Sequence, residues 1–206
     1  LSKAVEQNEK ILIYGDYDVD GTTSVAMFYG FLQKYIHQNI EFYIPDRYAE
    51  GYGVSQKGIE YAAENGFALI VSLDCGIKSV DKVAWAKEHG VDFIICDHHR
   101  PGDELPDAVA VLDPKREDCL YPFKELTGCG VGFKLLQAYC QVKDIDVNLL
   151  LPYLDLVVTS ISCDIVPIVG ENRVLAFYGL QQLNTNPRTG LKALIKYIMN
   201  LPDYQL

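Results

Sequence analysis

Short apolar runs alternate with longer segments whose apolar residues recur every three or four positions along the first half of the chain. The apolar runs predict strands at 10–15, 40–45, 68–74 and 92–97. The segments between them predict helices at 22–35, 55–66 and 79–90. Strands that alternate with helices form a mostly parallel sheet with helices on both faces. The sequence therefore predicts an α/β domain whose ligands bind beyond the carboxyl ends of the strands.

The middle of the chain breaks this alternation. A Pro- and Gly-bearing stretch at 98–128 predicts a long loop with one short strand at 108–112, and loops of that length are usually functional. A helical period returns at 131–143, whereas the apolar segment at 150–164 fits either a helix or a strand. The chemistry is therefore expected where the strands end and in this loop.

The last part of the chain is predicted to be helical. Two amphipathic helices are expected at 172–184 and 191–200, after a break at Pro167. We expect a catalytic domain over 1–167 and a helical extension over 168–206 that leads toward a second domain absent from the sequence.

Composition indicates a globular protein of a reducing compartment. Of the 206 residues, 49% are hydrophobic, enough for a large core. The six cysteines lack the spacing of a zinc site, and Cys75 and Cys96 lie in apolar, strand-like stretches, so we interpret them as buried, reduced thiols. No apolar run reaches the ~20 residues of a bilayer span. We expect a cytoplasmic protein with no membrane contact.

Three acids, Asp16, Asp18 and Asp20, directly follow the first predicted strand. Alternate residues of an extended chain point the same way, and crowded carboxylates repel one another unless a cation compensates. A hard divalent metal is the simplest compensation. A calcium-binding loop would require a Glu at its twelfth position, where this chain has Met27. A solvated acidic turn remains the alternative.

Two adjacent histidines, His98 and His99, follow another predicted strand and its terminal Asp97. Successive side chains diverge, so that one histidine can bind a metal while the other faces substrate. Asp74 and Asp164 also end apolar segments, although a single Asp after a strand is frequently a helix cap or a turn residue. The combination of these positions at one sheet edge indicates a metal site.

The formal charge of −10 argues against a nucleic-acid partner, because such proteins usually present a basic surface. Many of the acids, however, fall within the motifs above. Bound divalent cations would reverse the local field there, so that net charge alone does not decide the substrate.

The succession DYDVDG, an Asp at a strand end, DHH and an Asp before IVP resembles the four motifs of the DHH phosphoesterase family. The segments IPDRYAEGYGVS, LDCGI and SCDIVPIVGENR resemble the RecJ-like branch, the single-strand-specific DNA exonucleases. The resemblance covers nearly the whole chain. It implies a phosphodiester hydrolase that acts 5′ to 3′ on single-stranded DNA in recombination and repair.

The resemblance also implies roles for individual residues. The positions that match ligands of two divalent ions, usually Mn²⁺ or Mg²⁺, are Asp16, Asp18, Asp20, Asp74, His98 and Asp164. Asp74 is the expected bridging carboxylate, and His99 matches a residue near the scissile phosphate. Tyr14 stands where some members have a His ligand. The residues expected in catalysis are Asp74, His98 and His99.

Substrate contacts are expected at three further positions. Arg47 is a candidate phosphate ligand, and Tyr52, in a glycine-punctuated run, is a candidate for stacking on a base. Gly130, in a glycine run before a helix, is a candidate amide donor to phosphate. Structural packing is the alternative at each position.

Other functions fit the same motifs. Members of the family also act on small substrates such as short oligonucleotides, cyclic dinucleotides and pyrophosphate. A metal-binding scaffold without catalysis is the alternative from another class of protein. Helicases or single-strand-binding proteins are the expected protein partners of a RecJ-like exonuclease.

Overall fold

A single parallel sheet of five strands forms the centre of the computed structural model, which describes residues 1–199. The strands lie in the order β2-β1-β3-β4-β5, and every neighbouring pair is parallel. Their bounds are β1 Ile11–Gly15, β2 Ile40–Tyr43, β3 Leu69–Leu73, β4 Asp92–Cys96 and β5 Ala110–Leu112. The predicted mostly parallel α/β sheet is therefore confirmed.

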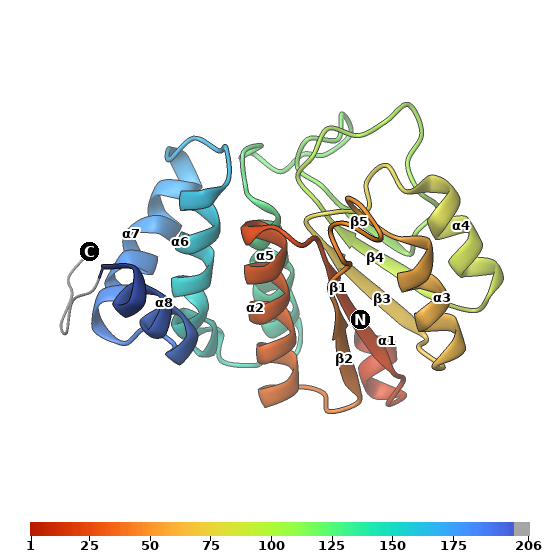
Figure 1. The fold of residues 1–206 in the computed structure, drawn as a ribbon, viewed down its shortest axis with the longest axis horizontal. Helices are drawn as coiled ribbons and strands as arrows, with labels where there is room; N and C mark the ends of the chain where they lie inside the picture. The colour runs from red at the N-terminus through yellow and green to blue at the C-terminus, as the bar shows by residue number, and fades with distance from the viewer. Residues whose placement is uncertain (200–206) are drawn as a thin grey trace.

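Both faces of this sheet are buried, because successive side chains of a strand point to opposite sides. On β1, Ile11 and Ile13 join one apolar cluster, whereas Leu12 and Tyr14 join the other. Helices cover each face (Figure 1). The first cluster is covered by α2 Val19–Tyr35, α5 Gly128–Val142 and α6 Leu154–Cys163, and the second by α3 Gln56–Glu64 and α4 Val80–Glu88.

The order of the strands reverses between β1 and β3. From β1 the chain crosses through α2 to β2 on one side, and then returns through α3 to β3 on the other side. In open parallel sheets, ligands bind in the crevice beyond the carboxyl ends of strands at such a reversal. Asp16 directly follows β1 and Asp74 directly follows β3, so both carboxylates lie at this position.

The apolar segment at 150–164, which fitted either a helix or a strand in the sequence, is helical. It forms the end of a 3₁₀ helix, η1 Val147–Tyr153, followed by α6. A short first helix, α1 Ser2–Glu6, was not predicted, and the last two helices are α7 Gly170–Thr185 and α8 Thr189–Met199.

Helix α7 packs on α6 rather than standing apart from the domain. Leu175, Ala176 and Leu183 belong to the same buried cluster as α2 and α5. A Cβ at Gly179 would lie 2.5 Å from the carbonyl oxygen of Leu154, so glycine permits this close approach. The core continues across residue 167, and a domain boundary there stays a prediction. Residues 200–206 of the predicted extension lie outside the described residues.

All six cysteines are free in the structure, and Cys75 and Cys96 are buried, as their apolar flanks predicted. Burial raises the pKa of the Cys96 thiol above its ordinary value, which makes it a poor nucleophile. Among residues 1–199, no helix combines the length and apolar character that crossing a bilayer requires.

A buried ion pair fastens the start of α8 to α6. The Asp155 carboxylate is fully buried and accepts hydrogen bonds from Arg188 Nε at 2.8 Å and from the Arg188 backbone N–H at 3.0 Å. Arg188 Nη2 lies 2.7 Å from the same carboxylate. Removing one partner of such a pair leaves an uncompensated buried charge.

We expect Arg188→Ala to lower the free energy of unfolding by about 3 kcal/mol, because Asp155 would remain buried without its cation. Lys87→Ala, which breaks the exposed pair with Asp107, should cost less than about 1 kcal/mol. Urea unfolding followed by circular dichroism measures both values. Equal losses in the two variants would show that the Asp155 pair contributes nothing beyond a surface contact.

Candidate metal centre

Acidic side chains from four different elements meet at the carboxyl edge of the sheet, along the loops at the top of Figure 1. Asp16 and Asp74 follow adjacent strands, and His98 lies two residues beyond β4. Asp164 comes from another layer, where it ends α6. The fold therefore gathers residues that are up to 148 positions apart in the sequence, counted from Asp16 to Asp164.

The sequence had predicted an extended run for the three acids of the first motif. The structure instead shows the start of a helix there. Helix α2 begins at Val19, so that Asp18 is its N-cap and accepts a hydrogen bond from the Gly21 N–H at 2.9 Å. Asp20 lies in the first helical turn and is buried, whereas Asp18 is exposed. A helical turn therefore directs these two carboxylates to different sides of the site.

Asp74 occupies a strained position. Its φ of 60° lies in the left-handed region, which is uncommon for a residue other than glycine. Its backbone N–H donates to the Cys96 carbonyl at 2.9 Å, which continues the sheet to this residue. Burial first, and then the charges of Asp20 and Asp18, raise the pKa of Asp74 to about 12. The carboxyl therefore holds a proton at neutral pH unless a cation replaces it.

The ligand atoms of these residues form overlapping groups. Within each group, the ligand atoms lie within 4.8 Å of one another. The groups are Asp16, Asp18 and Asp74; Asp20, His98 and Asp164; and Asp74, His98 and His99. The structure thus brings together every residue that the sequence predicted as a metal ligand, with Asp74 present in two of the groups.

The imidazole of His98 lies at the centre of these groups. Its Nε2 atom is 3.2 Å from Asp74 Oδ1 and 3.6 Å from Asp20 Oδ2. The same atom is 3.6 Å from Asp164 Oδ2. Burial lowers the pKa of His98, which favours the neutral imidazole that metals bind.

Three carboxylate oxygens in the site are buried without a hydrogen-bond partner among the described residues. They are Asp16 Oδ2, Asp74 Oδ1 and Asp164 Oδ2. Buried polar atoms are rarely left unsatisfied, and carboxylate oxygens with one imidazole are suitable ligands for a hard divalent ion. The donor set therefore fits divalent cations, one beside Asp16 and Asp18 and one beside Asp20 and Asp164.

A network of donors holds Asp20 in place. Its Oδ2 atom accepts from the Gly128 N–H at 2.7 Å, and its Oδ1 atom accepts from the Cys129 N–H at 2.8 Å. A Cβ at Gly128 would lie 2.5 Å from Asp74 Cβ, so only glycine allows the start of α5 to approach both acids. The hydroxyl of Ser160 donates to Asp20 Oδ1 at 2.8 Å.

Thr127 extends this network to the N-terminus of α5. Its hydroxyl oxygen lies 2.6 Å from that of Ser160. Because Ser160 has one hydroxyl proton and gives it to Asp20, Thr127 is the donor between the two hydroxyls. Thr127 in turn accepts from the Gly130 N–H at 3.0 Å. Gly130 is buried and its N–H is engaged, so the structure does not support the phosphate contact at Gly130, which stays a prediction.

Asp97 was not predicted as a site residue, yet it positions both histidines. Its Oδ1 atom accepts from the backbone N–H of His98 at 2.7 Å and lies 2.8 Å from His99 Nδ1. Its Oδ2 atom accepts from the Ile77 N–H at 2.9 Å. Burial opposes ionisation of Asp97, but the bonds from His99 and Ile77 outweigh it and lower the pKa. The sequence signal for Asp97 was an acid at the end of an apolar strand.

His99 lies beside the metal ligands, with its Nδ1 atom 4.0 Å from Asp74 Oδ1, and is partly open to solvent. Its Nε2 atom lies 2.9 Å from the Tyr52 hydroxyl, and the hydrogen bond with Asp97 raises the pKa of the imidazole. Tyr52 is 60% exposed, so it can contact substrate, although its hydroxyl is directed at His99. Arg47 is exposed in the turn after β2, with its guanidinium 5.3 Å from the centre of the Tyr17 ring.

Tyr14 lies in the core below the site. It is fully buried, and its hydroxyl donates to the Gly53 carbonyl at 3.0 Å and accepts from the Ser55 N–H at 2.9 Å. The Gly53 N–H donates to Asp16 Oδ1 at 3.3 Å. Tyr14 therefore orders the loop that supports Asp16.

Residues 10–161 match the family model described as the DHH family, N-terminal domain. The chain belongs to the DHH family. This match confirms the resemblance inferred from the four motifs, and the matched residues include every strand of the DHH domain and most of α6.

The DHH domain is similar to single-strand-specific exonucleases. It is 47% identical to the single-stranded-DNA-specific exonuclease RecJ of Bacillus subtilis strain 168, over 95% of this chain and 24% of that protein. It is 37% identical to RecJ of Salmonella typhimurium strain LT2, over 100% of this chain and 37% of that protein. The chain therefore spans well under half the length of these relatives.

A solved structure agrees with these sequence relatives. A crystal structure of exonuclease RecJ bound to manganese superimposes with a TM-score of 0.85 and 32% identity. The alignment covers 96% of this chain and 49% of that chain.

We expect Asp74→Asn to stabilise the metal-free protein above neutral pH. The pKa of Asp74 in the folded state exceeds the value of about 3.9 in an unfolded chain. The unfolded chain therefore loses this proton first, and stability falls as pH rises through the interval between the two pKa values. Asparagine cannot ionise. In EDTA the melting temperature of Asp74→Asn should therefore exceed that of the wild type, by a margin that grows from about pH 6 to about pH 8.

Added Mn²⁺ should raise the melting temperature of the wild type and leave that of Asp74→Asn nearly unchanged. Differential scanning calorimetry with and without Mn²⁺ measures both effects. If the wild type is more stable than Asp74→Asn in EDTA at every pH, the proposed crowding of carboxylates is refuted.

We expect Ser160→Ala to weaken Mn²⁺ binding by about 10- to 100-fold, because Asp20 loses a donor that orients its carboxylate. Ser162→Ala is a matched control, since the Ser162 hydroxyl bonds only to the Val158 carbonyl of the same helix. Isothermal titration calorimetry measures both affinities. Equal affinities in the two variants would show that the Ser160 hydroxyl does not support the site.

Proposed function

We propose that this chain is the catalytic domain of a RecJ-like exonuclease, which hydrolyses single-stranded DNA with two divalent ions, Mn²⁺ or Mg²⁺. The observation that carries the proposal is a pair of ligand groups, with buried oxygens that lack partners within the described chain: Asp16, Asp18 and Asp74 form one group, and Asp20, His98 and Asp164 form the other. The similarity to RecJ proteins, one of them solved with manganese, supports both the substrate class and the metal.

The residues divide between two ion positions. Asp16 and Asp18 would hold one ion, and Asp20, His98 and Asp164 would hold the other. Asp74 would contact both, because its carboxylate belongs to the group of Asp16 and Asp18 and lies 3.2 Å from His98 Nε2, which belongs to the group of Asp20 and Asp164. Two bound divalent ions would supply Lewis acidity at the phosphoryl group and activate water for an in-line displacement.

His99 is suited to act on the substrate itself. Asp97 holds its Nδ1 atom at 2.8 Å, which leaves Nε2 as the nitrogen that can face a phosphate. The raised pKa of His99 increases the protonated fraction near neutral pH. The imidazolium would donate a proton from Nε2 to a phosphate oxygen or to the departing 3′-oxygen. The Tyr52 hydroxyl contacts the same nitrogen. When substrate binds, Tyr52 would either move away from this nitrogen or share it with the substrate.

The wider biological setting follows from the similarity to RecJ. We propose digestion from the 5′ end, a role in recombination and repair in the cytoplasm, and cooperation with a helicase or a single-strand-binding protein. Arg47 remains a candidate phosphate contact because it is exposed beside the first motif.

The test is a panel of substrates incubated with the chain and Mn²⁺. It contains a 5′-labelled single-stranded DNA, its duplex, pyrophosphate and a cyclic dinucleotide. The proposal predicts release of 5′-mononucleotides from the single strand, and Asp74→Asn should abolish this release, which excludes a contaminating nuclease. Turnover confined to pyrophosphate or to the cyclic dinucleotide would contradict the exonuclease proposal and assign the domain to small substrates.

A further inference from the structure

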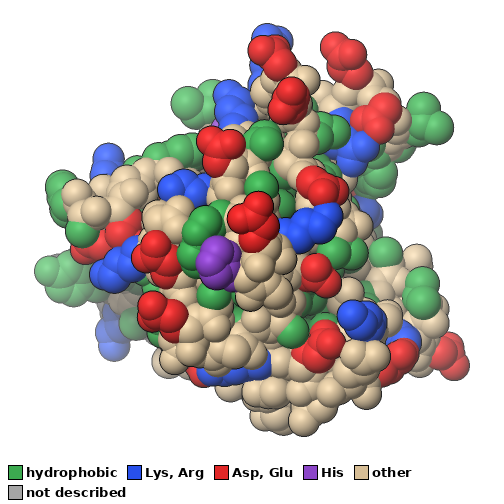
Figure 2. Space-filling view, turned by 90° about the vertical axis from the view of Figure 1, so that its right-hand side faces the viewer, with side chains coloured by type: hydrophobic (Ala, Val, Ile, Leu, Met, Phe, Trp, Pro, Cys, Tyr) green, Lys and Arg blue, Asp and Glu red, His purple; other side chains and the backbone are tan. Residues whose placement is uncertain are grey.

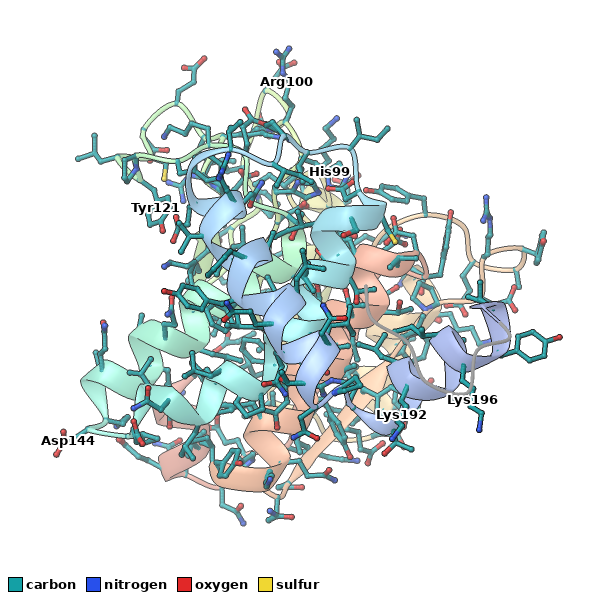
Figure 3. All side chains as sticks on the ribbon, turned by 90° about the vertical axis from the view of Figure 1, so that its left-hand side faces the viewer. His99, Arg100, Tyr121, Asp144, Lys192 and Lys196 are labelled. Carbon is teal, nitrogen blue, oxygen red and sulfur yellow. The ribbon has the colours of Figure 1, made fainter. Side chains whose placement is uncertain are left out.

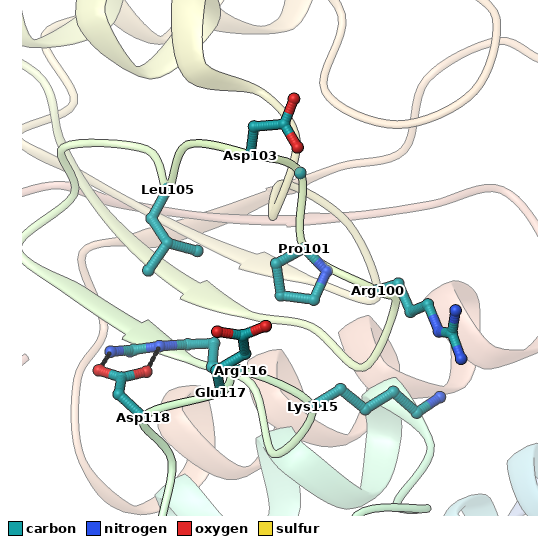
Figure 4. Close-up of a pocket in the computed structure, with 9 residues that line it drawn as sticks. Arg100, Pro101, Asp103, Leu105, Lys115, Arg116, Glu117 and Asp118 are labelled. Carbon is teal, nitrogen blue, oxygen red and sulfur yellow. Dashed lines mark hydrogen bonds and ion pairs between the residues drawn. The ribbon is translucent and has the colours of Figure 1, made fainter.

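A basic hollow lies beside the metal centre of this acidic chain. The hollow has a volume of about 410 Å³ and is lined by Arg100, Pro114, Lys115, Arg116, Lys124 and Glu125. It shares Arg100, Lys115 and Arg116 with an adjoining cavity of about 700 Å³ (Figure 4). Four cations and one acid line the smaller hollow, although the chain as a whole has 18 basic and 28 acidic residues.

Two of these cations are available to a ligand. Arg116 is committed to the Asp118 carboxylate and to the Val111 carbonyl, and the Lys124 ammonium donates to the Cys119 carbonyl. Among residues 1–199, the Lys115 ammonium has one acidic partner, Glu125, at the long distance of 3.9 Å. Arg100 makes no hydrogen bond or ion pair with any residue from 1 to 199.

In Figure 4, which draws the adjoining cavity, the side chains of Arg100 and Lys115 extend toward the same side. Asp113, which directly follows β5, accepts from the Lys115 N–H at 2.7 Å and so fixes the start of this turn. Both cations therefore belong to segments that leave the carboxyl edge of the sheet. Their side chains offer two positive charges to one ligand.

The hollow adjoins the reaction site. Arg100 follows His99 directly in the sequence, and both lie at the same end of the molecule, where Arg100 extends outward (Figure 3). By contrast, acidic and basic side chains are interspersed on the face turned toward the viewer in Figure 2. The concentration of positive charge in this hollow is thus a local feature.

We propose that this hollow binds the phosphodiester backbone of a single-stranded nucleic acid beside the scissile phosphate, with Arg100 and Lys115 each contacting a phosphate. The proposal rests on the proposed function and adds the path of the substrate. Arg100 is exposed and Lys115 half-buried, which suits a polymer that must advance after each cleavage better than a tightly enclosed anion. Contacts to phosphates carry no sequence information, so this path accepts any base sequence.

The test measures binding without turnover. Fluorescence anisotropy of a labelled oligothymidylate of about 12 nucleotides in EDTA gives the affinity across a series of KCl concentrations. The double variant Arg100→Ala/Lys115→Ala should bind about tenfold more weakly than the wild type, and the slope of log K against log salt should shrink by about 1.4 for two lost single-strand phosphate contacts.

Lys192→Ala/Lys196→Ala is the matched control, because it removes the same charge from α8, far from His99 in Figure 3. Its affinity and salt slope should equal those of the wild type. Equal losses in the two double variants would overturn the proposal, since they would reflect net charge alone. A wild type that does not bind the oligonucleotide would also overturn it.

The result is independent of the proposed activity. If the wild type releases mononucleotides with Mn²⁺ but Arg100→Ala/Lys115→Ala keeps the wild-type KM and salt slope, the hollow is not the path and the exonuclease function stands. If binding requires Arg100 and Lys115 but the Mn²⁺ assay yields no mononucleotides, the hollow binds nucleic acid and the exonuclease function fails.

Discussion

Mutual repulsion among carboxylates that are buried together is the constraint on which the rest of this structure depends. Asp16, Asp20 and Asp74 are each at most 3% exposed and converge at one edge of the sheet. Burial raises the pKa of all three, so ionising them together without a cation is electrostatically costly. The surrounding fold must hold these groups in a geometry that only cations complete.

Two different parts of the fold meet this constraint. On one side of the sheet, the N-terminus of α5 and the hydroxyl of Ser160 on α6 hold Asp20. On the other side, Tyr14 orders the loop whose Gly53 amide contacts Asp16. Asp74 lies between them on a left-handed backbone. This division explains why Asp16 with Asp18 and Asp20 with Asp164 lie in separate ligand groups, with Asp74 and His98 between them, and it relates the reversal of strand order to a site for two ions.

The sequence predicted the sheet, and it named the acids and the histidine that the structure brings together, because strand period and acidic strand ends are local signals. It did not predict the supporting contacts. Ser160 lies 140 positions from Asp20, and no local pattern relates the two. Gly130 has the sequence context of a phosphate-binding amide, but the cap residue Thr127 accepts its N–H. The extended geometry expected for Asp18 and Asp20 was wrong because α2 begins earlier than its apolar period indicated.

The central claim is that the crowded carboxylates hold two divalent ions on either side of Asp74. Anomalous diffraction from crystals of the chain grown with Mn²⁺ tests it most directly. The account predicts two manganese peaks, one contacting Asp16 and Asp18, one contacting Asp20 and His98, and both contacting Asp74. A single peak, or peaks that do not share the Asp74 carboxylate, would contradict it.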